Sequence, residues 1–193
     1  MRLLIFFLML GPAYSVIAQE RMTAEESTYT ISYAGNNLWN PGADLAFDRI
    51  IGNKESAASH RKNTRSFIWR GNAGFYIDPG SHGAVYTQFG LGLRKMKSKS
   101  SFTFYLSPVG LYRSFLTESY SVEETDVTRV FLPGNLYVAP SAGVDIGRSL
   151  NRGEGDELMV GIQMISLYPY NTYFMPLVNI RMGYRFSAKG GQR

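Results

Sequence analysis

The chain of 193 residues contains no cysteine, which excludes a disulfide scaffold and a cysteine-ligated metal site. Its two histidines are too few for a histidine-rich metal centre, so we expect neither a metal nor a cofactor. Charged residues make up only 18% of the chain, well below the roughly 25% of soluble globular proteins. Aromatic residues make up 14%, and this excludes a disordered chain, because disordered chains are poor in aromatics and rich in charge. The length fits a single domain.

Long apolar runs are also missing, except at the N-terminus. No later segment has the about 20 consecutive apolar residues that a membrane-spanning helix needs. Arg2 precedes an apolar run of eight residues, 3–10, which Gly11 and Pro12 end. A short positive start, an apolar run too short for a membrane anchor and small residues before Gln19 predict a secretory signal peptide over 1–18. The mature chain, 19–193, is then one domain, and a lipoprotein anchor is not expected because no cysteine follows the signal.

The mature chain instead alternates apolar and polar residues with a period of two, bounded by turn residues. This alternation is typical of β-strands with two different faces. The expected strands, which make an all-β, eight-stranded antiparallel up-and-down barrel, cover 28–35, 43–52, 66–78, 84–95, 101–115, 136–147, 158–164 and 178–186.

Two kinds of barrel fit such an alternation. A soluble periplasmic carrier of the lipocalin type would place the apolar face inside, around a ligand. A transmembrane barrel places it outside, against lipid, with polar residues within. The six lysines fall in connections, strand ends or the tail, whereas the polar faces carry Gly, Ala, Ser, Asn, Tyr and Arg. Such residues suit the narrow interior of an eight-stranded barrel, so the transmembrane barrel is the favoured prediction and the soluble carrier the alternative.

A resemblance to a known family supports this prediction. The secretion signal, the amphipathic strands and the closing segment Val178-Asn-Ile-Arg-Met-Gly-Tyr-Arg-Phe186 resemble small bacterial outer-membrane barrels of the OmpX/OmpA type. The segments 36–42, 112–116 and 168–171 also resemble uncharacterised outer-membrane barrel families. The resemblance covers 19–186, followed by a short tail. It implies an outer-membrane location, contact with outer-membrane lipid and lipopolysaccharide, and a last strand read by the barrel-assembly machinery. It transfers no functional residue.

Several charged residues fall on the polar faces of the expected strands. Buried charges must be paired, because an unpaired one costs several kcal/mol. We therefore expect an ion-pair network that fills the lumen; the alternative, a selective pore, needs a wider barrel. The expected members of the network are Arg70, Arg94, Arg181, Arg185, Asp48 and Asp145.

Catalytic signals are weak. Ser81 and His82 are adjacent, and some eight-stranded outer-membrane barrels are lipid A deacylases that use serine, histidine and an acidic residue. Neighbours on a turn are expected to point apart, and His60 is in a polar connection, so a strand-connecting turn set by Pro79 and Gly80 is the preferred interpretation. A lipid A-modifying enzyme remains the rival function. Lys95–Lys99 is basic but more typical of a solvated hairpin, and no nucleic acid partner is expected.

The connections give the only hint of a ligand. If both termini are periplasmic, 36–42, 78–83, 116–134 and 168–172 form the outer rim, with a net charge of −4, against +4 for the opposite connections 53–65, 96–100 and 148–157. Exposed aromatic and acidic loops could bind a surface protein or a glycan, although the aromatics also suit an interfacial girdle. A structural, adhesive or surface-binding role is therefore expected, with weak candidate binding residues Trp39, His82, Tyr120, Glu123, Glu124, Tyr168, Tyr170 and Asn171.

Overall fold

The structure is a computed structural model. It describes residues 27–36, 39–55, 63–79, 81–97, 99–116, 120–123, 126–129, 133–150, 156–170 and 173–188. The expected signal peptide, His60, Glu124 and Asn171 lie outside these residues. Within the described ranges, no helix is long and apolar enough to span a membrane.

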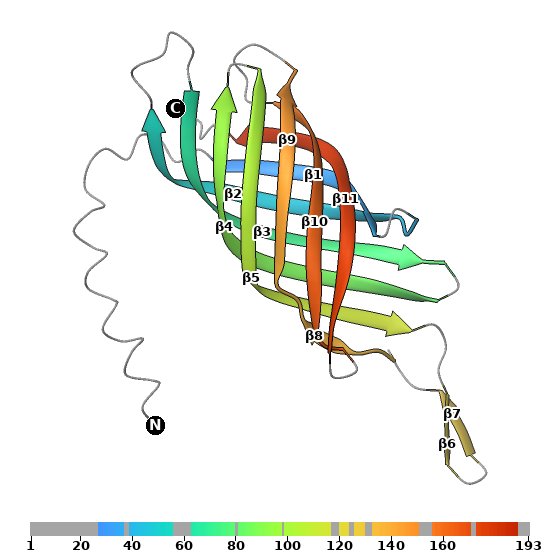
Figure 1. Ribbon diagram of the computed structural model, residues 1–193. Coiled ribbons are helices and arrows are strands. Elements are labelled where there is room, and N and C mark those ends of the chain that lie inside the picture. Colours follow the sequence, from blue (N-terminus) through green and yellow to red (C-terminus); the bar gives the residue numbers. More distant parts are fainter. Residues whose placement is uncertain are drawn as a thin grey trace, which may run out of the picture.

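The described residues form antiparallel strands (Figure 1). The strands are β1 (Ser27–Asn36), β2 (Gly42–Glu55), β3 (Asn63–Asp78), β4 (His82–Lys97), β5 (Ser100–Leu116), β6 (Tyr120–Glu123), β7 (Asp126–Arg129), β8 (Leu136–Val138), β9 (Ser141–Ser149), β10 (Glu157–Tyr170) and β11 (Tyr173–Ala188). Strands β1 to β5 pair in sequence order, β8 and β9 pair with both β5 and β10, and β11 pairs with both β10 and β1. The sheet therefore closes on itself and leaves no free edge in the barrel.

Two short strands share one place in the ring. Both β8 and β9 lie between β5 and β10, and Pro140, which has no N–H to donate, stands between them. Pairing continues across the break, because Ala139 N–H donates to the Gly110 carbonyl at 2.8 Å and Ser166 N–H donates to the Pro140 carbonyl at 2.9 Å. Because β8 and β9 together occupy the position of one barrel strand, the nine strands of the main sheet form an eight-stranded barrel. This confirms the predicted eight-stranded antiparallel fold.

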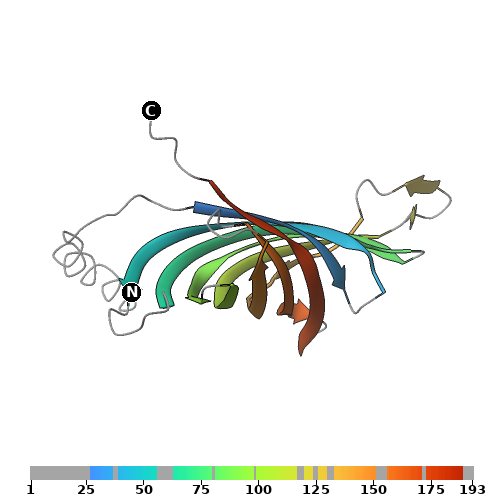
Figure 2. The ribbon, with the colours of Figure 1, turned by 90° about the horizontal axis from the view of Figure 1, so that it is seen from above.

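A small hairpin was not foreseen from the sequence. β6 and β7 pair only with each other and stand beyond the barrel wall in Figures 1 and 2. They lie inside the expected connection 116–134. Because β6 and β7 lie outside the ring, they do not change the end of the barrel at which each later connection lies. Four connections, 37–41, 79–81, 117–135 and 171–172, lie at one end, called here the loop end. β1 begins and β11 ends at the other, the terminal end.

One irregularity in the wall follows from a proline. The pairing of β4 with β5 shifts between Phe89 and Leu91, opposite Pro108. Both Leu106 and Val109 therefore face outward, at 54% and 62% exposure, as expected for a bulge that accommodates proline. Gly90 lies against this bulge: a Cβ there would be 2.0 Å from the Leu106 carbonyl oxygen. The glycine thus permits the close approach of the two backbones.

Burial follows the predicted alternation with polar residues inside. Outward-facing Val160 and Ile162 are about half exposed, whereas inward-facing Arg70 and Arg181 are fully buried. The same division holds around the ring, since buried charged residues come from β2, β3, β4, β9, β10 and β11. The core of this molecule is therefore a polar lumen inside an apolar shell.

Candidate functional site

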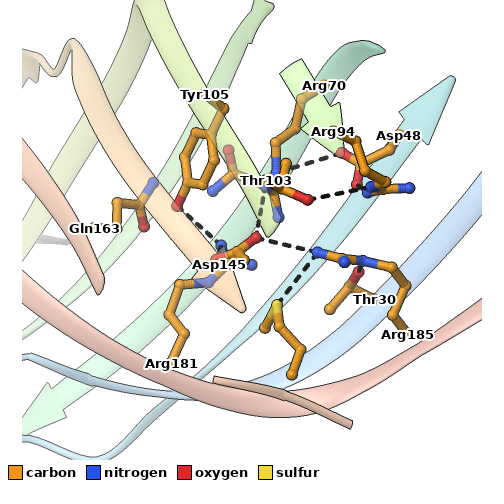
Figure 3. Close-up of polar contacts among 12 residues, drawn as sticks. Thr30, Asp48, Arg70, Arg94, Thr103, Tyr105, Asp145, Gln163, Arg181 and Arg185 are labelled. Atoms are coloured by element: carbon orange, nitrogen blue, oxygen red, sulfur yellow. Dashed lines mark hydrogen bonds and ion pairs between the residues drawn. The ribbon is translucent and has the colours of Figure 1, made fainter. Parts of the chain in front are cut away.

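The terminal half of the lumen is organised around the carboxylate of Asp145 on β9. It accepts a hydrogen bond from Arg70 Nη1 at 2.8 Å and one from Arg185 Nη2 at 3.2 Å. Arg181 Nη1 lies 3.4 Å from its other oxygen. Figure 3 shows these side chains converging from different walls of the barrel. One carboxylate thus links three cations that the chain carries on β3 and β11.

A second carboxylate, Asp48 on β2, continues the network. Arg70 Nε lies 3.4 Å from Asp48 Oδ1, and Arg94 on β4 binds Asp48 Oδ2. Arg94 also donates to Thr28 Oγ1 at 3.0 Å and to Thr103 Oγ1 at 3.2 Å. The structure therefore brings together all six charged residues that the sequence analysis assigned to the lumen.

Three members of the network were missed from the sequence. Asp44 pairs with Arg181, and Glu157 Oε2 accepts from Arg185 Nη1 at 3.1 Å. Tyr105 accepts from Arg181 Nη1 at 3.0 Å and lies 4.0 Å below the Arg70 guanidinium. Asp44 has the same parity as Asp48 on one expected strand, which was a usable signal.

Glu157 corrects an expectation. It was placed in the connection 148–157, but it is the first residue of β10 and is 5% exposed. Counting it and Asp44, four arginines meet four carboxylates in the lumen. The charges balance, as burial in a low-dielectric interior demands.

Amide side chains fill the middle of the lumen. Gln88 Oε1 accepts from Gln163 Nε2 at 2.6 Å and from Asn72 Nδ2 at 3.2 Å. Asn72 Nδ2 is also 3.1 Å from Asp44 Oδ2, which joins this layer to the ion pairs. Gln88 and Gln163 are fully buried. The described residues at mid-height thus bridge the lumen by hydrogen bonds, as in a plugged barrel.

Tyrosines close the lumen at the loop end, a cluster that the sequence analysis did not identify. The hydroxyls of Tyr76 and Tyr112 hydrogen-bond to each other. The ring of Tyr112 lies 5.9 Å from that of Tyr137, which lies 5.7 Å from Tyr170. Buried aliphatic residues on β10 and β11 pack against them. Polar-face parity would have placed Tyr76 and Tyr137 inside, but the bulge at Pro108 shifts the alternation before Tyr112, and Tyr170 was expected in a connection.

The adjacent Ser81 and His82 do not point apart, contrary to expectation. Ser81 Oγ is 3.0 Å from His82 Nδ1, and Asp78 Oδ2 is 3.7 Å from the same nitrogen. The opposite ring nitrogen, Nε2, lies 3.2 Å from the Tyr76 hydroxyl. In a hydrolytic triad the nucleophile and the carboxylate occupy opposite nitrogens of the histidine. Here serine and aspartate share one nitrogen, so this arrangement is not that of a triad.

The structure places the remaining candidate rim residues at the loop end, on separate elements. Trp39, in the β1–β2 connection, is 84% exposed. Tyr120 begins β6, and Glu123 ends it. Tyr168 faces outward with its ring centroid 4.9 Å from that of Phe174, whereas Tyr170 faces the lumen. These residues share an end of the barrel but do not form one contact cluster among the described residues.

Comparisons with known proteins give resemblances of shape only. No protein-family model matches the chain, and no curated protein matches it in sequence. The solved structure of the outer-membrane enzyme PagL is similar at TM-score 0.47 and 8% identity, covering 82% of this chain and 98% of that one. The structure of Ail, the attachment invasion locus protein of Yersinia pestis, is similar at TM-score 0.46 and 9% identity, covering 85% of this chain and 100% of that one. The structure of Neisserial surface protein A is similar at TM-score 0.44 and 9% identity, covering 86% of this chain and 95% of that one.

Proposed function

We propose that this chain is an integral outer-membrane β-barrel whose loop end binds partners at the cell surface. The observation that carries the proposal is the apolar outer shell of the barrel around a charged, hydrogen-bonded lumen. Exposed Leu, Ile, Val and Phe side chains occur on every wall of the ring. Such a surface would be a large aggregation hazard in water, whereas in lipid it is the expected arrangement.

The height of the apolar shell fits a membrane. On the loop side its outward-facing charge is Arg113, which shares a row with Val85 of β4. On the terminal side the outward-facing charges include Arg65 of β3 and its pairing partner Lys95, which lies on β4 as Val85 does. The ten residue steps from Val85 to Lys95 span about 33 Å along the strand. With a strand tilt of about 40°, this corresponds to about 25 Å across the barrel, the height of the apolar band in outer-membrane barrels.

The lumen argues against the soluble carrier. A lipocalin-type protein encloses a cavity for an apolar ligand, but here buried arginines, carboxylates and amides occupy the interior. The proposal includes a signal peptide over 1–18 and delivery to the membrane by the barrel-assembly machinery, which reads a last strand such as β11.

A charge difference supports a binding role for the loop end. Its connections, 37–41, 79–81, 117–135 and 171–172, carry a net −3, whereas the opposite connections, 56–62, 98–99 and 150–156, carry +2. Exposed basic residues also surround the terminal end of the barrel wall: Arg49, Arg65, Lys95, Lys97 and Arg148. An acidic, aromatic loop end facing outward would attract basic partner surfaces, with an attraction that fades as salt screens it over about 8–10 Å.

Substitution of the outer shell tests the membrane assignment. Ile162 faces outward at mid-strand and is 51% exposed. Ile162→Arg should lower the free energy of unfolding from lipid vesicles by about 2–4 kcal/mol, because it places a charge at the bilayer centre. Leu158→Arg, at the terminal end of the same strand, is the control and should cost about 0–1 kcal/mol. Equal costs at the two depths would contradict the proposal.

The orientation is tested separately with an epitope tag. A tag inserted beside Glu124, in the connection between β5 and β8, should bind antibody on intact cells. A matched tag in the 56–62 connection should become accessible only after the outer membrane is permeabilised. Labelling in the opposite order would place the loop end in the periplasm and remove the basis for a surface-binding role.

The rival function, a lipid A-modifying enzyme, is less well supported. Its best candidate residues, Ser81 and His82, are in contact, but Asp78 approaches the nitrogen that already faces the serine. A comparison of lipid A by mass spectrometry, with and without the gene, distinguishes the two functions: an unchanged profile is expected.

A further inference from the structure

The outer wall of the barrel is hollowed on one side. Two adjoining hollows of about 670 and 400 Å³ lie over β2, β3 and β4. They share Leu45, Ala73 and Thr87 and so form one trough along the wall. Both are open to the exterior of the barrel, where the proposed function places lipid.

The trough arises from small residues between large ones. In one row of paired outward positions, Ala73 and Thr87 stand between Leu45 and Leu111. In the next row towards the terminal end, Gly71 stands between Phe47 and Phe89. The floor is therefore made by β3 and β4, and the larger side chains form walls on either side.

The two ends of the trough differ in chemistry. Arg113 on β5 lines the loop-side end. It is the only charged residue among the described outward-facing barrel positions of the loop half. Aromatic rings line the other end, where Trp69 lies 5.9 Å from Phe89 and 6.3 Å from Phe47. A cation thus stands at the expected depth of the headgroups, and an apolar channel runs from it towards the middle of the membrane.

The length of the trough fits an acyl chain. Arg113 shares a row with Phe75, through Val85, and Trp69 lies six residues further along β3. Six residues span about 20 Å of strand, or about 15 Å of depth at the usual tilt, which is half of the roughly 30 Å hydrocarbon core.

We propose that this trough is a specific lipid site, in which an acyl chain lies over Ala73 and Thr87 while its anionic phosphate headgroup binds Arg113. A guanidinium offers five N–H donors in a fork that matches phosphate oxygens, so Arg113 can serve more than one acceptor. The occupant is an anionic phospholipid-like molecule of the leaflet on the loop side. The inference rests on the proposed membrane location.

Tryptophan quenching by brominated lipid tests the site. The chain has two tryptophans, so Trp39→Phe leaves Trp69, which lies within the trough, as the sole tryptophan. The protein is refolded into vesicles of phosphatidylcholine brominated near the chain end, mixed with unbrominated phosphatidic acid. Phosphatidic acid should displace the quencher with a preference of about fivefold, the effect expected of one basic side chain near an anionic lipid, equivalent to about 1 kcal/mol.

Three variants in the same background identify the residues responsible. Arg113→Gln should reduce the preference to about onefold, and Ala73→Leu, which fills the floor, should lower quenching by chain-end bromine. Ala142→Leu is the control: Ala142 also faces outward, between Leu106 and Met164, but does not line either hollow, and its quenching should match the parent. If bromine quenched Trp69 but phosphatidic acid were not preferred, and Arg113→Gln left the quenching unchanged, the lipid site would be overturned. Absence of all quenching would overturn the membrane location itself.

Discussion

A single carboxylate holds the lumen together at the scale of the residue. Asp145 faces three arginines, and a Cβ on neighbouring Gly161 would lie 2.2 Å from its Oδ1. The inward-facing glycine therefore makes room for the carboxylate where the three cations converge. Asp145 is thus neither free to move nor replaceable by a larger group.

Removing the charge of Asp145 should destabilise the barrel strongly. Asp145→Asn keeps the shape but leaves buried arginines with one carboxylate too few, and breaking a buried ion pair costs about 3–5 kcal/mol. Unfolding by urea in lipid vesicles measures the loss. Asp156→Asn is the control, because Asp156 accepts an exposed hydrogen bond from Tyr184 and should change stability by less than about 0.5 kcal/mol. If Asp145→Asn lost as little stability as the control, the network would contribute no net stability.

The wall depends, at the scale of the element, on the close approach of β4 to the bulge of β5. Gly90→Ala places a methyl group 2.0 Å from the Leu106 carbonyl oxygen, so the strands must separate. We expect a loss of about 1–3 kcal/mol from overpacking and faster hydrogen exchange of amides between β4 and β5. Gly52→Ala is the matched control, because a Cβ there meets nothing within 4 Å. Equal stability of the two variants would show that the bulge tolerates a wider spacing.

The whole molecule should behave as a closed barrel. Ion pairs and amides cross the lumen at the terminal end and at mid-height, and tyrosines fill the loop end. An eight-stranded barrel has an interior just wide enough for side chains, so planar-bilayer recordings should show no steady conductance. A stable open channel would refute the plugged lumen. Arg185→Ala, which removes a bridge to Glu157 at 3.1 Å, is the variant in which leak currents should first appear.

Much of this architecture is readable from the chain alone. Period-two alternation separates outward Ile162 from inward Gln163, because successive side chains of a strand point to opposite faces. The scarcity of lysine on the polar faces indicates which face is enclosed. The hairpin β6–β7 escaped this reading, because two strands of four residues each are too short to show a period.

The contacts within the lumen could not be read in the same way. Parity places Arg70 and Asp145 inside, but they lie 75 residues apart on β3 and β9. Likewise parity places Tyr76 inside, whereas Tyr112 turns inward only because the bulge at Pro108 shifts the alternation of β5, and the sequence does not show that the two hydroxyls meet. The trough also escaped detection, since Ala73 and Thr87 become one floor only when β3 and β4 pair in register.

The sequence by itself therefore determined the eight strands of the barrel and the face that side chains take along each regular stretch, but not the β6–β7 hairpin or the shift at Pro108. These depend on the local geometry of an extended chain, in which alternate residues differ in environment. Only the tertiary structure decided which arginine meets which carboxylate, how Ser81 and Asp78 approach His82, and where the wall is hollow. Those contacts depend on the stagger and closure of the ring, which couple distant strands and leave no periodic trace along the chain.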